Sequence, residues 1–153
     1  MPRQVQLVEM TEEEREIFVA EAYVEYLNRM VDAGRWTETN AQQRIDALVK
    51  STPPDRHAAG QRFYRVIGDG EVVGGLWLQI DADILFVMQL TIIEASRQAG
   101  WGRAAMQEVE AMARTMGMRR LALNVFFNNT PALQLYESEG YSGYMQQMIK
   151  RLD

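Results

Sequence analysis

The segment that decides the fold runs from Ile92 to Ala105 and reads IIEASRQAGWGRAA. It follows a long apolar run typical of a buried strand and leads into a stretch with helical apolar spacing. The first backbone N–H groups of a helix have no acceptor within it, and the helix dipole attracts negative charge there. Gly100 and Gly102 lack side chains that would keep an anion away from the backbone. Arg97 and Arg103 add positive charge. The segment therefore predicts a phosphate-binding turn, although an ordinary strand-to-helix turn with solvated arginines fits the spacing equally well.

The stretch Gly100–Ala105 also matches the G-x-G-x-x-A fingerprint of dinucleotide-binding folds. That fingerprint normally opens its domain, and an acidic residue follows it by about 20 positions at the end of the next strand. Here the next apolar run ends in residues 124–128, which contain no carboxylate, and only the last third of the chain remains. A nicotinamide or flavin enzyme is therefore the less favoured interpretation.

A second block of residues follows this turn at a regular spacing. It consists of Val125, Asn129, Ala132, Leu135, Tyr136, Gly140 and Tyr141. Its pattern is V-x3-N-x2-A-x2-L-Y-x3-G-[FY], and the first block contributes I-x4-R-x2-G-x-G from Ile92 to Gly102. Two such blocks in this order resemble the GCN5-related N-acetyltransferase (GNAT) superfamily, in particular its small bacterial members. The resemblance is specific from about Ile84 to Leu152.

The resemblance implies a fold and a reaction. The expected fold is α+β (mixed α/β): a single GNAT-like N-acetyltransferase domain over residues 1–153. Its central, mostly antiparallel twisted sheet would have about six or seven strands, helices on both faces and a splayed strand pair at the cofactor site. The expected reaction transfers an acetyl group from acetyl-CoA to a primary amine of a small molecule or peptide, by direct attack in a ternary complex.

The resemblance also assigns residues to the site. In the family, the strand before the loop pairs its main chain with the pantetheine arm, and Leu90, Thr91 and Ile92 occupy those positions. Amides of the turn hold the pyrophosphate, which makes Arg97, Gln98, Ala99, Gly100, Trp101, Gly102 and Arg103 cofactor-binding residues. Asn129 would contact the pantetheine or orient the acceptor, and Tyr136 would direct its hydroxyl at the thioester sulfur.

Tyr136 is accordingly the expected catalytic residue. Attack by an amine on a thioester expels a thiolate, and a positioned hydroxyl can protonate the sulfur as charge develops. Outside the second block, an aromatic residue on a short helix would more simply be part of the core. Asn129 has an alternative role as a local capping or turn residue before Thr130 and Pro131.

The general base has no clear candidate. Many relatives carry a carboxylate near the position of Gln89, and a neutral amide cannot take a proton from an ammonium group. A water relay, or a carboxylate elsewhere such as Glu21, Glu25 or Glu94, would have to replace it. His57 is another titratable group, but a single loop histidine is more often solvated or structural. A non-catalytic acyl-CoA-binding module therefore stays open as an alternative.

Acceptor recognition is expected from the first two helices and from the loop Thr52–Gly60. The side chains that could line a site for a cationic amine are Glu21, Tyr23, Glu25, Tyr26 and Trp36. An equally good interpretation is a solvated acidic helix face with its aromatic residues packed in the core.

Composition sets broader bounds. The chain has 153 residues, 47% of them hydrophobic, and a formal net charge of -5, which favours one domain and gives no basic stretch for nucleic acid. It contains no cysteine, which excludes a disulfide scaffold, a thiolate metal site and a cysteine nucleophile. No apolar run approaches the roughly 20 residues of a membrane span. We expect a cytoplasmic protein without a metal, whose partners are acetyl-CoA and an amine, and for which a homodimer remains open.

Local patterns predict the individual elements. The expected helices run from a capping box at Thr11 to Gly34, over Ala41–Val49 with Thr39 or Asn40 as cap, over Gly102–Met116, and from Thr130 as cap to Ser138. The expected strands are residues 5–10, Phe63–Ile67, Glu71–Ile80, Ile84–Ile93, Leu121–Phe127 and Tyr144–Leu152, with a hairpin turn at Gly68–Gly70.

Overall fold

The computed structural model describes residues 2–51 and 60–153. His57 and the rest of the expected acceptor loop before Gly60 lie outside the described residues. The chain divides into two compact units. The first combines residues 1–19 with 54–124, and the second combines residues 20–53 with 125–153.

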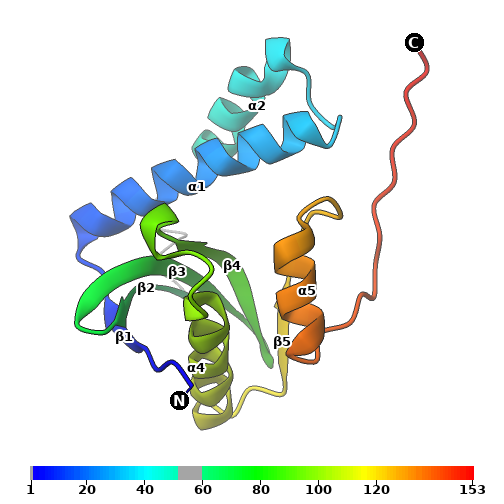
Figure 1. The fold of residues 1–153 in the computed structure, drawn as a ribbon. Coiled ribbons are helices and arrows are strands. Elements are labelled where there is room, and N and C mark those ends of the chain that lie inside the picture. The colour runs from blue at the N-terminus through cyan, green and yellow to red at the C-terminus, as the bar shows by residue number, and fades with distance from the viewer. Residues whose placement is uncertain (1, 52–59) are drawn as a thin grey trace. The chain divides into compact units, whose positions relative to one another are not determined.

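The first unit is built on a five-stranded sheet with the strand order β1-β2-β3-β4-β5 (Figure 1). The strands are β1 (Gln6–Glu9), β2 (Gln61–Gly68), β3 (Glu71–Asp81), β4 (Ile84–Ile92) and β5 (Arg120–Leu123). Neighbouring strands are antiparallel except β4 and β5, which are parallel. One parallel pair does not make the doubly wound parallel sheet of a dinucleotide-binding fold. The α+β class is confirmed, and residues 2–51 and 60–153 contain five strands in place of the six or seven expected.

The predicted hairpin between β2 and β3 is confirmed. Asp69 and Gly70 connect the strands with positive φ angles of 53° and 80°. Two consecutive left-handed residues match the twist of antiparallel strands, and aspartate followed by glycine adopts them readily.

Strand β4 pairs with β3 over its whole length and with β5 only over its first part. Its residues Ile84–Val87 pair in parallel with Arg120–Leu123 of β5. On the β3 side Trp77 lies opposite Gln89 while Leu78 lies opposite Val87, so the register skips Met88, the extra residue of a β-bulge. Among the described strands, only β3 accompanies β4 beyond this bulge. Strand β5 thus ends opposite Val87, and β4 continues past Met88 with β3 as its strand partner in the described part of the chain, while the expected splay of the pair stays a prediction.

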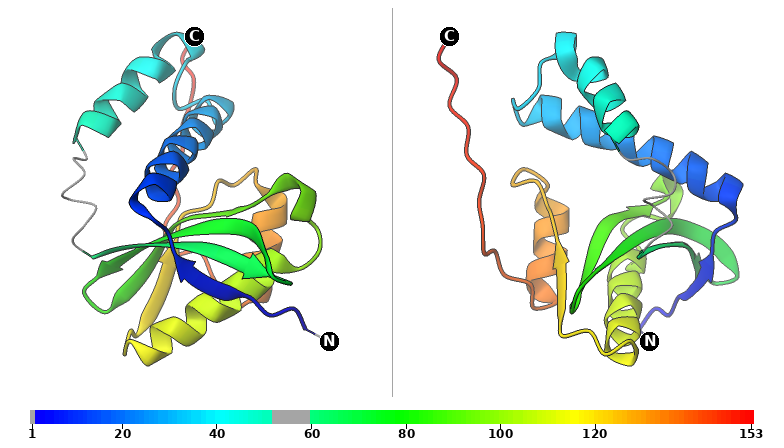
Figure 2. Two further views of the ribbon diagram at one scale, coloured as in Figure 1. Left: turned by 90° about the vertical axis from the view of Figure 1, so that its left-hand side faces the viewer. Right: turned by 180° about the vertical axis from the view of Figure 1, so that it is seen from behind.

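Helices of the first unit pack on the sheet at positions where glycines make room. A Cβ on Gly75 of β3 would lie 2.4 Å from Phe18, near the start of helix α1 (Glu12–Asp32). A Cβ on Gly68 would lie 2.6 Å from the Trp101 ring at the start of helix α4 (Trp101–Thr115). Figure 2 shows α4 lying along the sheet. The largest fully buried side chains of this unit are Val66, Leu76, Leu78, Leu85, Met106 and Val109.

The capping box predicted for α1 is confirmed. The Thr11 N–H donates to Glu14 Oε1 at 3.0 Å, and the Glu14 N–H donates to Thr11 Oγ1 at 3.2 Å. Helix α2 (Glu38–Ser51) starts in the same way at Thr37, whose hydroxyl and N–H pair with Asn40. The predicted cap at Thr39 or Asn40 was therefore wrong. Thr37 is the capping residue, and Asn40 is its partner three positions later.

The second unit contains α2, the remainder of α1 and helix α5 (Thr130–Ser138). Its core consists of Trp36, Ala41 and Ile45, packed against Tyr23, Leu27, Met30, Val31 and Leu48. Asn129 rather than Thr130 occupies the N-cap position of helix α5, and Pro131 lies in the first turn as expected. Gly140 follows it with a φ of 95°.

Two predicted strands need correction. Strand β5 ends at Leu123, so the expected stretch to Phe127 is strand only in its first part. The structure assigns no strand to Tyr144–Leu152. The side chains of Tyr144, Met148 and Leu152 are more than 80% exposed, so this segment does not bury the apolar face that its composition suggested. No described helix is long and apolar enough to cross a membrane.

Candidate functional site

The edge of β4 beyond the bulge carries backbone groups that point away from β3. The Ile93 N–H donates to the Val73 carbonyl at 2.8 Å, and Thr91 lies opposite Gly75. Backbone groups of successive residues alternate in direction along a strand. The N–H and C=O groups of Leu90 and Ile92 therefore face the side where β5 has ended, whereas those of Thr91 face β3.

The loop after β4 leads the chain into the start of α4. It contains a 3-10 turn, η1 (Glu94–Ser96), and two residues with left-handed backbone, Gln98 (φ 60°) and Gly100 (φ 87°). Gly100 is the N-cap of α4. The Ala104 N–H donates the first hydrogen bond of the helix to the Gly100 carbonyl oxygen at 3.1 Å. The amides of Trp101 and Gly102 precede that bond and have no acceptor within the helix. With the N-terminal end of a 15-residue helix behind them, these amides form a site suited to an anion.

Trp101 anchors this helix start in the core of the first unit. Its side chain is only 6% exposed although it occupies the first position of α4. The indole fills the space that a Cβ on Gly68 would need. Trp101 therefore contributes to the loop through its backbone, while its ring fixes the position of the helix end.

Gln89 lies partly buried on β4, on the same side of the strand as Thr91. Its Nε2 donates to the Thr91 Oγ1 at 3.1 Å. This contact holds the amide group in one orientation. The sequence did not indicate Thr91 as a partner of Gln89, although two residues at i and i+2 on a strand share a face.

Tyr136 belongs to α5 of the second unit. Its ring meets that of Tyr141 edge-on, with 5.7 Å between centroids. Burial raises the pKa of the Tyr136 phenol above its ordinary value, and the negative charge of Glu25 raises it further. The hydroxyl is therefore protonated at neutral pH and able to donate a proton.

Asn129 precedes Tyr136 by two helical turns. Its backbone carbonyl accepts the Leu133 N–H at 3.0 Å, but its side chain makes no capping bond to the helix. The side chain of Asn129 is thus not used for the local capping that was its alternative role. The carboxylates named as alternative bases are all exposed: Glu21, Glu25 and Glu94.

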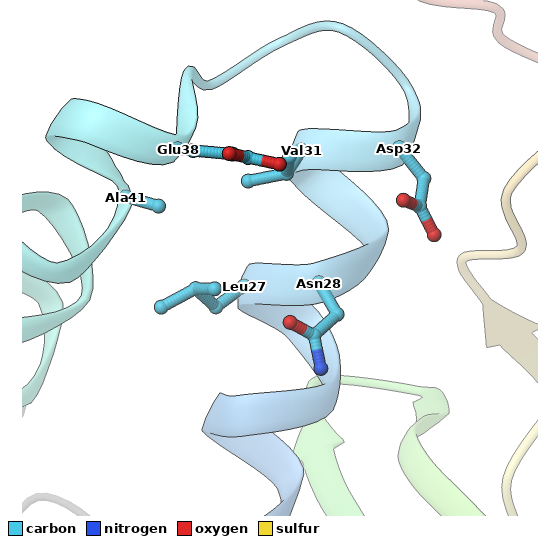
Figure 3. Close-up of a pocket in the computed structure, with 6 residues that line it drawn as sticks. All are labelled: Leu27, Asn28, Val31, Asp32, Glu38 and Ala41. Carbon is cyan, nitrogen blue, oxygen red and sulfur yellow. The ribbon is translucent and has the colours of Figure 1, made fainter.

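The aromatic residues expected to line an acceptor site are mainly packing residues of the second unit. Trp36 is 7% exposed and lies in the core of this unit. Tyr26 contacts the Trp36 ring edge-on at 5.6 Å between centroids and the Phe126 ring at 6.2 Å. A groove of about 330 Å³ lies between α1 and α2, lined by Leu27, Asn28, Val31, Asp32, Glu38 and Ala41 (Figure 3).

Two N-acetyltransferases of one organism are similar to this chain over nearly its whole length. The uncharacterized N-acetyltransferase YdgE of Bacillus subtilis (strain 168) is 32% identical over 152 residues, which are 95% of this chain and 97% of YdgE. The uncharacterized N-acetyltransferase YycN of the same organism is 26% identical over 97% of this chain and 99% of its own. The crystal structure of YycN matches with a TM-score of 0.88 at 25% identity and covers 97% of this chain and 99% of YycN.

A third relative shares the fold alone. The PaiA N-acetyltransferase of Thermoplasma acidophilum, solved in complex with coenzyme A, has a TM-score of 0.65 at 16% identity and covers 94% of this chain and 93% of its own. The sequence pattern of the acetyltransferase (GNAT) family matches residues 10–141. This match covers most of the sequence, and the chain therefore belongs to the acetyltransferase (GNAT) family.

Proposed function

We propose that residues 1–153 act as one N-acetyltransferase domain that transfers an acetyl group from acetyl-CoA to a primary amine by direct attack in a ternary complex. The observation that carries this proposal is the open edge of β4 beyond Met88, which continues directly into the amide-lined loop at Gly100. An extended arm ending in a pyrophosphate needs these two features side by side, one to pair as a strand would and one to hold an anion. The coenzyme A complex of PaiA, a protein with the same fold, supports the choice of ligand.

The residues of the first unit fit coenzyme A chemically. On the open edge, the backbone groups of Leu90 and the N–H of Ile92 would pair with the pantetheine, while the backbone of Thr91 is directed to β3. The loop from Arg97 to Arg103 would hold the pyrophosphate, mainly through amides at Gly100, Trp101 and Gly102. Because backbone amides would bind the pyrophosphate, an acidic protein can hold an anionic ligand without a basic surface patch.

Tyr136 would supply the proton that the departing sulfur needs. The amine nitrogen attacks the thioester carbonyl, the carbon–sulfur bond breaks, and the sulfur accepts the phenol proton, which solvent later replaces. The raised pKa of Tyr136 keeps that proton in place before the reaction. Asn129, whose side chain makes no capping bond, would contact the pantetheine or orient the acceptor.

The amine must also lose a proton. Gln89 cannot accept it, since its amide is neutral. We propose that water, or one of the exposed carboxylates Glu21, Glu25 and Glu94, performs this step.

A thiol-release assay tests the proposal. The protein would be incubated with acetyl-CoA and a panel of primary amines, and free thiol would be followed over time. Saturable release that depends on one amine is the expected result. The observation of Gln89 in place of a carboxylate favours one alternative, a non-catalytic acyl-CoA-binding module. Tight coenzyme A binding with no amine-dependent release across the panel would support that module instead.

A further inference from the structure

Arg3 contacts two parts of the first unit that are far apart from it and from each other in sequence. Its Nε donates to the carbonyl oxygen of Ala99 at 3.1 Å, and its Nη1 donates to Asp69 Oδ2 at 3.1 Å. The guanidinium also lies over the Trp101 ring, with 4.6 Å from Cζ to the ring centroid. One side chain thus joins the turn between β2 and β3 to the loop before α4.

The contact with Ala99 has a consequence for the next residue. A trans peptide group is planar, so its carbonyl oxygen and its N–H point in opposite directions. The peptide that carries the Ala99 oxygen also carries the Gly100 N–H. Holding the oxygen on the side of Arg3 therefore directs the Gly100 N–H to the opposite side of the loop. Gly100, with no Cβ and a left-handed φ, would otherwise permit this peptide to rotate.

We propose that Arg3 is a positioning residue that fixes the Gly100 amide for the pyrophosphate of coenzyme A. This proposal rests on the proposed function, since it assigns that ligand to the loop. Arg3 acts through the peptide orientation and does not itself bind the ligand. The planar fork of arginine allows both hydrogen bonds at once, with the ring contact below it.

Two simpler roles for Arg3, attraction of an anion by its charge and stabilisation of the fold, do not explain these contacts. Asp69 pairs with Arg3 and offsets its charge, so the pair adds little net attraction for an anion. The Arg3 and Asp69 side chains are 46% and 75% exposed, and exposed ion pairs contribute little to stability. The effect of Arg3 should therefore appear in ligand affinity more than in melting temperature.

The test measures binding of two ligands by calorimetry: coenzyme A, and pantetheine, which lacks the pyrophosphate. Arg3→Ala and Arg3→Lys should each weaken coenzyme A binding about tenfold, or about 1.4 kcal/mol, and leave pantetheine affinity unchanged. Lysine keeps the charge but cannot form both bonds of the fork. Arg114→Ala is the matched control, because Arg114 forms an exposed ion pair with Glu110 on the same helix, α4. It should change neither affinity.

Three outcomes would overturn the proposal. Full coenzyme A affinity in a folded Arg3→Lys variant would mean that charge is sufficient, and an equal loss for pantetheine would mean that Arg3 supports the whole site. Stronger coenzyme A binding in Asp69→Asn would mean that Arg3 acts as a free cation, whereas positioning predicts equal or weaker binding. If the wild type fails to bind coenzyme A, the proposed function itself is wrong, which separates that failure from a failure of the role of Arg3.

Discussion

The Nε of Arg97 donates a hydrogen bond of 2.9 Å to the carbonyl oxygen of Ile92, the last residue of β4. That oxygen lies on the open side of the strand, because the next N–H, of Ile93, is bonded to β3. Arg97 therefore closes the turn between β4 and the loop, rather than extending its Nε into solvent.

Arg97→Ala should weaken coenzyme A binding about fivefold, because the loop loses the bond that fixes it to the strand and one positive charge. Calorimetry at low and high salt separates the two causes, since only the charge is screened. Arg97→Lys should recover part of the affinity at low salt alone. Equal affinity of wild type and Arg97→Ala at both salt concentrations would remove Arg97 from the binding site.

Gly100→Val should weaken coenzyme A binding at least tenfold, or about 1.4 kcal/mol. The φ of 87° strains any residue with a Cβ, and this Cβ would lie 3.6 Å from Arg3 Cγ, so the new side chain would also disturb the contact between Arg3 and the loop. Gly117→Val is the control, since Gly117 has a φ of 76° just after the other end of α4 and open space around its Cβ position. It imposes similar strain and should leave affinity unchanged. Calorimetry that shows wild-type affinity in folded Gly100→Val would exclude the loop.

Gly68→Ala should lower the free energy of unfolding by about 1–3 kcal/mol, because the added methyl would overlap the rigid Trp101 ring. Denaturant unfolding measures the loss. Gly143→Ala, with open space at its Cβ position, should be close to neutral. In Gly68→Ala/Trp101→Leu the two substitutions should cost less together than the sum of their separate costs. Additive costs would show that the two residues are not coupled.

Tyr136→Phe should keep its fold and its coenzyme A affinity while kcat falls on the order of 100-fold. Phenylalanine preserves the ring that meets Tyr141 and deletes only the hydroxyl. Single-turnover kinetics are needed, because slow product release can hide a change in chemistry. The control is Tyr64→Phe, on a residue of β2 in the first unit. Wild-type kcat in Tyr136→Phe would mean that Tyr136 is a packing residue.

The raised pKa of Tyr136 predicts the behaviour at alkaline pH. Its ordinary value is 10.0, and burial followed by the charge of Glu25 shifts the pKa upward. Above pH 10 the unfolded chain loses this proton before the folded protein does, so stability falls as pH rises. The wild type should therefore lose more unfolding free energy above pH 10 than Tyr136→Phe. A phenolate absorbance that appears well below pH 10 in wild type and is absent from Tyr136→Phe would contradict the shift.

Sequence patterns predicted the elements that depend on near neighbours. The Thr11–Glu14 capping box, the Asp69–Gly70 turn and helix α4 each follow from residues a few positions apart, and all three are present. The splayed strand pair stays a prediction from the family resemblance, because β5 ends at Leu123, opposite Val87 of β4.

Sequence patterns did not predict three other features: the contact of Arg3 with Ala99, the conformation of Tyr144–Leu152 and the start of α2. Arg3 and Ala99 are 96 positions apart, and no local pattern links them. The segment Tyr144–Leu152 has a strand-like composition, but its large apolar side chains are exposed. The start of α2 was misplaced because its capping pair uses Asn40 where a glutamate or glutamine is usual.

A loop whose anion-binding groups are backbone amides has a chemical consequence under the proposed function, in which the protein binds an acyl donor. Thioesters acylate unprotonated amines, and an acetylated lysine loses its positive charge. The chain has only two lysines, Lys50 and Lys150, among 16 basic residues, and neither is in the segment from Arg97 to Arg103. The phosphate site proposed for this loop consists of peptide groups and arginines and offers no such amine, so acetylation by acetyl-CoA would not inactivate it.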